Sequence, residues 1–286
     1  MQILNNALPG LARKEDYPDI AALWQEAFGD SREYIDRFTD TLDITRDIFV
    51  MRAAGRVRAM HCAVPVYLRS EDILERGVYF YSCCTKKEFR GMGLLRELMK
   101  FSHEELRRRG ERFAVVTPAR PGLFPMYRSF GFDLEAYGTP GLVGAPDRPL
   151  SEREKAAFLA LERTPFDGDT DLLYSLYRVA VGRDRAAFLS TREFFPLTFD
   201  GYSVDYITVE GRKVGFAVYE NDINKNDIIV HSFYTDRRDN YGIIETDIGE
   251  TVLKDRLENR EAKALYRVFG EDIPVKDPRL DLFAER

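Results

Sequence analysis

The sequence predicts an α+β protein built from two similar halves. Helical spacing of apolar residues alternates along the chain with extended apolar and aromatic runs. Short glycine-containing turns join some of the extended runs, as in β-hairpins. The same order of elements then occurs twice, roughly 150 residues apart.

Helices are expected at three places in the first half. Asp16 would cap a first helix, with Pro18 in its first turn and apolar residues at helical spacing through Phe28. A second helix follows and runs towards Thr41. The third covers 94–109, where leucines line one side and arginines fill the last turn.

Extended runs separate these helices and predict the strands of the first half. They cover residues 48–54, 58–68, 78–85 and 113–117, and Ala54-Gly55-Arg56 joins the first two tightly.

A segment rich in glycine and proline divides the chain. Three glycines and three prolines lie between Tyr137 and Ser151, which predicts a linker. We therefore expect a first domain at 1–140, a linker at 141–150 and a second domain at 151–286.

The second half repeats the order of the first. Helix-like pieces at 171–180 and 186–189 precede a two-stranded run that turns at Glu210-Gly211-Arg212. The run from Ile228 then matches the run from Val78.

The two runs have the same residues at some matching positions and different residues at others. Ser232 and Thr235 have the spacing of Ser82 and Thr85. Asn240 stands where the first copy has an arginine, and a single Gly242 replaces two glycines. The second copy is therefore expected to be degenerate.

Composition restricts the class of protein. The 286 residues carry a net charge of −6, with a pI near 5.4, which argues against nucleic acid as a partner. No apolar run approaches the ~20 residues of a membrane span, and the N-terminus lacks the pattern of a signal peptide. Three cysteines, not spaced as a zinc site or disulfide framework, are expected to be reduced thiols in a cytoplasmic protein without a metal.

The segment Arg90-Gly91-Met92-Gly93 joins a strand to a helix and is the strongest chemical signal. Free backbone N–H groups and the dipole at a helix N-terminus favour an anion, and glycines let a phosphate come close. Arg90 adds a positive charge. The spacing fits neither a P-loop nor a dinucleotide-binding fingerprint, so by itself the turn is equally compatible with a structural role.

The wider arrangement resembles the GNAT superfamily of acyl-CoA-dependent N-acyltransferases. Its motif Gln/Arg-x-x-Gly-x-Gly/Ala maps onto Arg90, Gly93 and Leu95, and its tyrosine followed by Gly-Phe maps onto Tyr127 and Gly131-Phe132. The resemblance implies a central mixed sheet flanked by helices, in two tandem GNAT-like domains. It also implies acetyl-CoA as co-substrate, bound by Cys83, Cys84, Thr85, Arg90, Gly91, Met92, Gly93, Leu94 and Leu95.

One position, Leu95, indicates which branch of the superfamily the sequence resembles. Leu95 stands where glycine or alanine is usual, which is similar to the mycobacterial "enhanced intracellular survival" aminoglycoside acetyltransferases. Those proteins also place a degenerate GNAT domain after an active one. They carry a third, sterol-carrier-like domain as well, for which this sequence leaves no room before Arg286, so their substrate is not carried over.

The resemblance implies direct attack of an amine on the thioester in a ternary complex. Tyr127 would protonate the leaving thiolate, and Glu75 could act as general base through water. Glu33 and Tyr34 would border the site of a small-molecule or peptide amine. A covalent route through Cys83 or Cys84 lacks a partnered His/Asp pattern and is disfavoured.

Other classes of function stay open. The alternative is a non-catalytic acyl-CoA-binding or regulatory GNAT-like protein that kept the loop and lost turnover. A transferase that uses charged tRNA is disfavoured by the acidic balance. His61, within an apolar strand, is expected to be a partnered sheet histidine, and the sequence leaves the formation of a homo-oligomer open.

Overall fold

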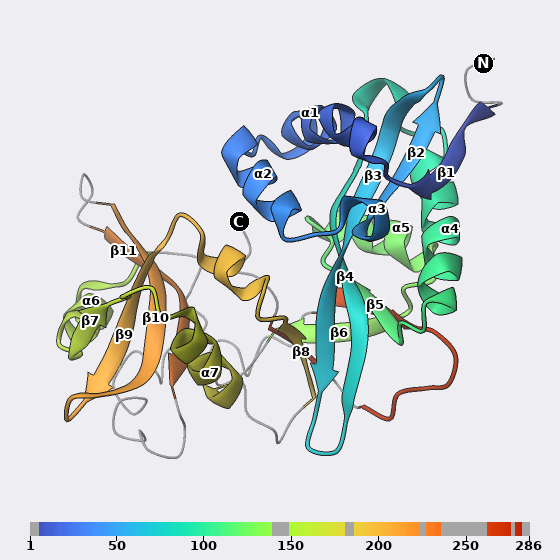
Figure 1. Cartoon of the computed structure of the whole chain (residues 1–286). Helices are drawn as coiled ribbons and strands as arrows, with labels where there is room; N and C mark the ends of the chain where they lie inside the picture. Colours follow the sequence, from blue (N-terminus) through green and yellow to red (C-terminus); the bar gives the residue numbers. More distant parts are fainter. Residues whose placement is uncertain are drawn as a thin grey trace. The chain divides into compact units, whose positions relative to one another are not determined.

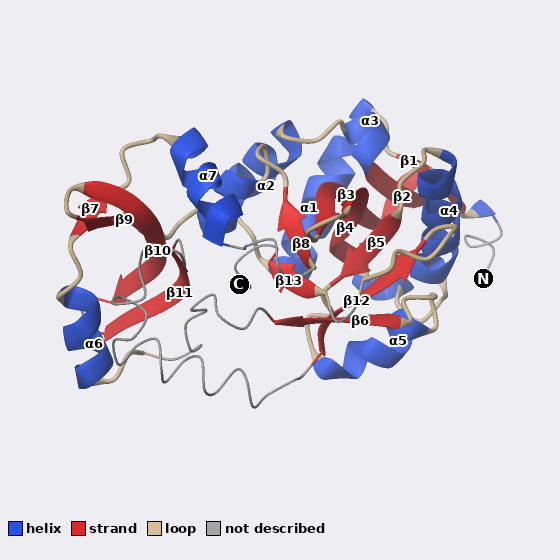
Figure 2. Ribbon diagram, turned by 90° about the horizontal axis from the view of Figure 1, so that it is seen from below, coloured by secondary structure: helices blue, strands red, loops and turns tan. Residues whose placement is uncertain are grey.

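The protein folds into two compact units that both mix helices and strands (Figures 1 and 2). The computed structural model describes residues 6–138, 149–180, 186–222, 227–235, 262–275 and 278–281. Unit 1 comprises Met1–Leu68, Ile73–Ala136 and Lys263–Lys276, and unit 2 comprises Arg69–Asp72, Tyr137–Ala262 and Asp277–Arg286. The predicted α+β class is confirmed.

Unit 1 contains a mixed sheet in the order β1-β2-β3-β4-β5-β12-β6. The strand pairs β1–β2, β2–β3 and β5–β12 are antiparallel, and the pair β4–β5 is parallel. Its elements are β1 (Leu8–Leu11), α1 (Tyr17–Phe28), α2 (Arg32–Asp40), α3 (Ile44–Asp47), β2 (Ile48–Ala53), β3 (Arg56–Arg69), β4 (Leu74–Thr85), α4 (Leu94–Arg108), β5 (Phe113–Val116), α5 (Phe124–Arg128), β6 (Leu134–Gly138) and β12 (Ala262–Val268).

Helices cover both faces of this sheet, as the sequence predicts. Figure 1 shows α1 and α2 against one face of the central strands and α4 against the other. The order places β12, from the C-terminal part of the chain, between β5 and β6. No local sequence pattern predicts that placement, because Leu265 and its partner Val116 are far apart in the chain.

The start of α1 differs in detail from the prediction. Pro18 lies in the first turn, but the Asp16 side chain makes no capping bond to the helix. It accepts a hydrogen bond from the backbone N–H of Arg13 at 2.7 Å and forms an ion pair with Arg52. Asp16 therefore ties the start of α1 to β2 rather than capping it.

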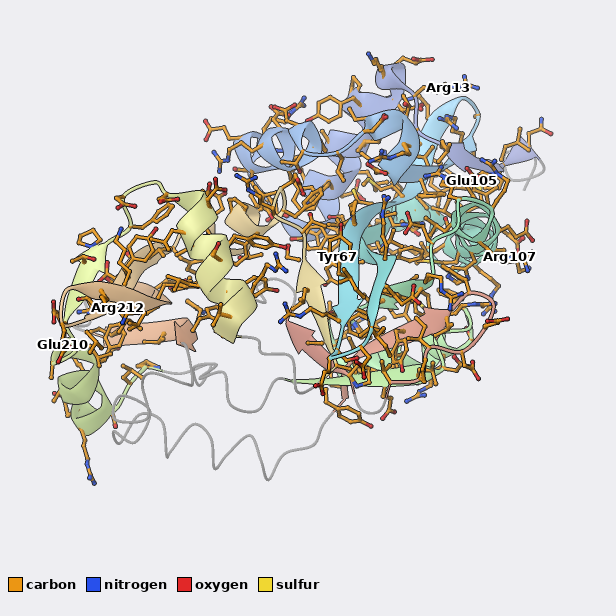
Figure 3. All side chains as sticks on the ribbon, turned by 60° about the horizontal axis from the view of Figure 1, so that its bottom comes forward. Arg13, Tyr67, Glu105, Arg107, Glu210 and Arg212 are labelled. Atoms are coloured by element: carbon orange, nitrogen blue, oxygen red, sulfur yellow. The ribbon has the colours of Figure 1, made fainter. Side chains whose placement is uncertain are left out.

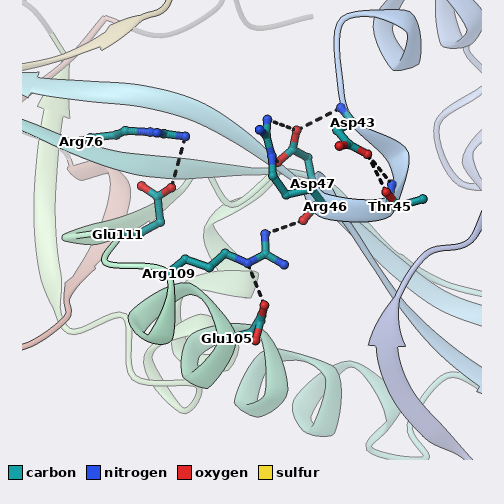
Figure 4. A network of polar contacts seen from close by, with 8 residues as sticks. All are labelled: Asp43, Thr45, Arg46, Asp47, Arg76, Glu105, Arg109 and Glu111. Carbon is teal, nitrogen blue, oxygen red and sulfur yellow. Dashed lines mark hydrogen bonds and ion pairs between the residues drawn. The ribbon is translucent and has the colours of Figure 1, made fainter.

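A polar network fixes the C-terminal end of α4 (Figure 4). Arg109 donates from Nε to Glu105 Oε1 at 2.8 Å and from Nη1 to the backbone oxygen of Arg46 at 2.6 Å. Asp47 pairs with Arg46 and accepts the backbone N–H of Asp43 at 3.0 Å. These bonds hold the C-terminal end of α4 to α3. The N-terminal end of α4 follows the glycine turn directly.

Unit 2 contains a four-stranded antiparallel sheet in the order β11-β10-β9-β7. Its elements are α6 (Glu152–Leu159), β7 (Arg163–Pro165), α7 (Thr170–Ala180), β8 (Ala187–Ser190), β9 (Ser203–Val209), β10 (Arg212–Asp222), β11 (Asp227–Thr235) and β13 (Arg279–Asp281). Strand β8 pairs with β13 in parallel. The helix expected at 186–189 is therefore wrong, because a short apolar run does not distinguish a buried strand from a helix.

The hairpins of the two halves have the same turn. The strands β2 and β3 turn through Ala54-Gly55, and β9 and β10 turn through Glu210-Gly211; all four residues have a positive φ. Figure 3 labels Glu210, in the second turn, and Arg212, the first residue of β10. Two central residues with positive φ match the twist of the flanking strands in two-residue hairpins.

The two hairpins also share an irregularity. The register of β3 skips Arg58, and that of β10 skips Val214. Each is the third residue of its strand. Asn240 and Gly242 lie outside the described residues, as does the predicted linker except for its last two residues, and the predicted domain bounds stay a prediction.

Candidate functional site

In β4, the alternation of side chains between the two faces of the sheet is interrupted at Ser82, which has a φ of 53°. Positive φ is uncommon for a residue with a Cβ. Before this point, the Phe80 ring lies 5.6 Å from that of Phe132, on the α4 side of the sheet. The Tyr81 ring lies 5.8 Å from that of Trp24 in α1, on the other side.

Beyond Ser82, Cys83 and Cys84 lie on opposite sides of β4. The Cys83 side chain packs against the core cluster that contains Phe80 and Tyr127, and the Tyr127 hydroxyl affects the pKa of the Cys83 thiol. The Cys84 thiol lies within electrostatic range of Glu26 in α1. Cys83 therefore shares the side of Phe80, three residues before it, so the pleat is shifted by one residue, as at a β-bulge.

Burial keeps both of these cysteines protonated. It raises the pKa of the Cys83 thiol to about 12, and it raises the pKa of Cys84 as well. Since a thiolate is the nucleophilic form, neither residue is poised for covalent catalysis at neutral pH.

The strands β4 and β5 pair over a short stretch only. Their register joins Val78 to Ala114 and Tyr79 to Val115. β5 ends at Val116, whereas β4 continues to Thr85. The backbone of β4 from Ser82 onwards therefore extends past the end of its parallel neighbour, and an extended ligand could pair with a strand edge of this kind.

The glycine turn lies between β4 and α4. Gly91 and Gly93 have φ values of 75° and 79°, and a Cβ built on either would meet nothing within 4 Å. The glycines are therefore required by backbone conformation, and the space around them is open. Arg90 is exposed and donates from Nε to the backbone oxygen of Thr85 at 3.0 Å.

The first turn of α4 follows directly. Its first intrahelical bond runs from the Glu97 N–H to the Gly93 oxygen at 3.1 Å, so the preceding amides of the helix lack partners within it. Leu94 is buried and Leu95 half-buried against the core, whereas Met92 is 49% exposed. An open turn with unpaired amides and an exposed arginine fits a pyrophosphate.

Tyr127 lies in α5 and is buried. Its ring makes edge contacts with Phe130 and Phe132, each at a centroid distance of 6.0 Å. Burial raises the pKa of its hydroxyl well above the ordinary value of 10, so the O–H group stays neutral. The structure thus brings Tyr127 together with Cys83 and the end of β4.

The two residues expected at the substrate site, Glu33 and Tyr34, differ in burial and in what they contact. Ser31 Oγ accepts the N–H of Tyr34 at 3.1 Å and caps α2. The Tyr34 hydroxyl lies 3.2 Å from that of Tyr81 in β4, and either can donate. Glu33 lies exposed on the first turn of α2.

Glu75 lies near the other end of β4. Its carboxylate pairs with Arg112 Nε at 3.4 Å. Eight residues of strand separate it from Cys83, which corresponds to roughly 26 Å. The structure does not bring Glu75 to Cys83 and Tyr127.

No sequence pattern predicts the positions of three residues near the site, which are Ser82, Glu26 and Arg267. The aromatic run before Ser82 indicates a strand but not a positive φ. Glu26, which accepts the backbone N–H of Lys87 at 3.0 Å, is one of many surface carboxylates in the sequence. Arg267 approaches the turn after α5 from a distant segment.

Part of this chain is similar to a known protein family. Residues 10–134 match the family model of the acetyltransferase (GNAT) domain. This segment is similar to a GNAT acetyltransferase domain. It includes the glycine turn, Tyr127 and β6's first residue, but not β12. No curated protein matches the sequence.

Solved structures share the fold of the GNAT domain and of the rest of the chain. A GCN5-related N-acetyltransferase from Anabaena variabilis superposes with a TM-score of 0.61 at 11% identity, over 91% of this chain and 65% of that one. Eis1 from Mycobacterium abscessus gives 0.55 at 13%, over 91% and 65%. N-myristoyltransferase from Saccharomyces cerevisiae, with bound myristoyl-CoA, gives 0.51 at 14%, over 95% and 78%. The chain thus spans just under two thirds of the first two proteins.

No group of three or more His, Cys, Asp or Glu side chains in the described part of the chain could hold a metal ion. Every helix in the described ranges is too short or too polar to cross a membrane.

Proposed function

We propose that the GNAT domain of unit 1 is an acyl-CoA-dependent N-acyltransferase. It would transfer an acetyl group from acetyl-CoA to a primary amine of a small molecule or peptide, by direct attack in a ternary complex. The observation that carries the proposal is the meeting of three parts at the end of β4: the open glycine turn, the stretch of β4 that extends past the end of β5, and the buried Tyr127.

The turn would hold the pyrophosphate of the co-substrate. The amides at the start of α4 and the exposed Arg90 supply hydrogen-bond donors and positive charge, which together bind phosphate oxygens. The backbone from Cys83 to Thr85 would pair with the pantetheine arm. Acetyl-CoA, when bound, supplies a thioester carbonyl for attack and releases a thiolate.

Tyr127 would act on the departing sulfur. Because its pKa is raised, the hydroxyl is a weak source of a free proton and a persistent hydrogen-bond donor. Its O–H bond would stabilise the developing negative charge, and the proton lost by the attacking amine could neutralise the thiolate through solvent. Tyr34 and Tyr81 would form an aromatic border on the α1–α2 side, where the amine approaches.

The second half would be a degenerate copy of the first, in a tandem arrangement. The matching type of hairpin turn and the skipped third residue, Arg58 in β3 and Val214 in β10, support a shared origin. The resemblance to the "enhanced intracellular survival" branch rests on Leu95 and on this tandem order. Cytoplasmic location and a homo-oligomer stay predictions.

The test combines binding with turnover. Calorimetry would measure acetyl-CoA binding to the full chain, and thiol release would be followed across a panel of small amines and N-terminal peptides. Binding with amine-dependent thiol release supports the proposal. Binding without turnover for any amine favours the alternative, a non-catalytic acyl-CoA-binding protein, and the lack of binding rejects both.

A further inference from the structure

The turn that follows α5 is bonded directly to Tyr127. The Tyr127 backbone oxygen accepts the N–H of Phe130 at 2.9 Å and that of Phe132 at 3.2 Å. The rings of both phenylalanines also contact the Tyr127 ring. Any shift of this turn therefore moves the backbone and the ring of Tyr127 together.

Arg267 of β12 holds the turn from one side. Its Nη1 donates to the backbone oxygen of Phe130 at 3.3 Å. The guanidinium also lies against Gly131, because a Cβ added there would meet Nη1 at 2.0 Å. Gly131 has a φ of 94°, so both its backbone and the close approach of Arg267 require glycine. Figure 2 shows β12 beside α5, with β5 and β6 as its neighbours in the sheet.

Arg96 of α4 holds the same turn at a second point. Its guanidinium donates to the backbone oxygen of Ser129 at 3.3 Å and to Ser129 Oγ at 3.2 Å. It also lies over the Phe130 ring, 5.2 Å from the centroid. Planar guanidinium groups suit such combined stacking and hydrogen bonding, which lysine does not reproduce.

We propose that Arg267 is a positioning residue for Tyr127. The connection runs through two hydrogen bonds, from Arg267 Nη1 to the Phe130 oxygen and from the Phe130 N–H to the Tyr127 oxygen. Arg267 fixes the turn, and the turn fixes the hydroxyl of Tyr127 next to Cys83. The role of the hydroxyl rests on the proposed function, whereas the clamp on the turn does not.

The consequence for catalysis follows from the geometry. Arg267 lies on β12, and its contacts described above are with Phe130 and Gly131 rather than with the glycine turn or Arg90, so its loss is expected to leave acetyl-CoA binding intact. A misplacement of about 1 Å in a catalytic group lowers a rate by up to about 100-fold. The expected effect is therefore a fall in kcat of about tenfold or more, with the KM for acetyl-CoA changed less than about twofold.

The first measurement is independent of activity. Hydrogen–deuterium exchange of residues 124–132 would be compared in the wild type, Arg267→Met and Arg267→Lys. Arg267→Met removes the donor, so exchange in this segment is expected to increase; the lysine can still donate one bond, so it should restore part of the protection. Arg112→Lys is the matched control, because Arg112 Nη2 donates to the Glu271 oxygen at 3.3 Å and so ties the segment after β12 without touching the turn.

The second measurement separates positioning from general loss of structure. In the active enzyme, Arg267→Met should lower kcat while Kd for acetyl-CoA is kept, Arg267→Lys should recover part of the rate, and Arg112→Lys should keep it. Adding Arg267→Met to Tyr127→Phe should cause no further loss, because the hydroxyl that it positions is already gone.

The outcomes distinguish this inference from the proposed function. If the wild type shows no turnover with any amine, the catalytic assignment of Tyr127 fails, and the exchange data alone decide whether Arg267 clamps the turn. If residues 124–132 exchange alike in Arg267→Met and wild type, or if that variant keeps a wild-type kcat in an active enzyme, the inference is overturned.

Discussion

Acidification below about pH 6.5 is expected to destabilise unit 1 through two histidines that the fold buries in neutral form. His61 is fully buried, with Nε2 2.7 Å from Ser102 Oγ. His103 is buried between the rings of Phe80 and Phe269, and its Nε2 has no hydrogen-bond partner among the described residues. Burial lowers the pKa of each histidine to about 3, and the charge of Arg267 contributes at His103.

The direction of the effect follows from the lowered pKa values. Between about pH 6.5 and pH 3, the unfolded chain binds protons at both positions and the folded chain does not, so stability falls as the pH falls. Each histidine contributes a slope of about 1.4 kcal/mol per pH unit. From pH 6.5 to pH 5 the two together remove about 3 kcal/mol, because the histidines of the unfolded chain are only half protonated at pH 6.5. This is a large part of the ~5–15 kcal/mol of a typical domain.

Carboxyl groups affect stability mainly in a different range of pH. Glu105, with a pKa of about 2, and Asp16 and Asp43, with lowered pKa values, cost stability as the pH falls below about 4.5. Glu111 acts in the opposite direction, because burial raises its pKa. A variant is therefore needed to isolate the histidines.

The assay is urea unfolding between pH 7.5 and pH 5, followed by the fluorescence of Trp24. This is the single tryptophan of the chain and is buried in unit 1, so the signal reports on that unit. His103→Phe should halve the slope of stability against pH. Phe132→Leu removes neighbouring ring contacts but no titrating group, so it should lower stability and keep the slope. Equal slopes for wild type and His103→Phe would refute the reasoning.

Three further predictions concern the site. Arg90→Glu should raise the Kd for acetyl-CoA about tenfold or more in calorimetry. Arg107→Glu, on an exposed arginine of α4 that points away from the molecule (Figure 3), should not. Tyr127→Phe should lower kcat at least about tenfold while the KM for acetyl-CoA changes little, and an unaffected kcat would exclude the hydroxyl. Cys83→Ala should keep turnover, since its thiol is protonated at neutral pH; an acylated Cys83 peptide in the mass spectrum of the wild type would contradict this.

Local patterns predicted most of the elements that build the site. The helix at 94–109, the strand at 78–85 and both hairpins follow from short-range periodicity and glycine turns, and the structure has them within a few residues. His61, expected to be partnered, is bonded to Ser102. His103 lies on a helix with charged neighbours, and its burial depends on rings from other elements, which periodicity within the helix does not reveal.

The features that the sequence did not predict depend on contacts between distant segments. A serine gives no signal for the positive φ of Ser82, because residues with a Cβ rarely adopt this conformation. Glu75 was placed near the reaction because it precedes the correct strand. Glu75 lies at the start of the long strand β4, at the end opposite to Cys83, and its carboxylate forms an ion pair with Arg112 there.

The placement of β12 changes how the domain that contains the GNAT-like segment must be delimited. The family match ends at residue 134, yet β12 supplies Leu265 to the core of unit 1 and pairs along the edge of β5. Without it, the buried residues of β5 would lose their antiparallel partner, and unpaired buried backbone groups are costly. The same strand carries Arg267, which contacts the Gly-Phe element that identified the domain in sequence. Gly131 is therefore explained by a residue that the family match does not cover, so the part of the chain that closes this domain lies in its C-terminal half.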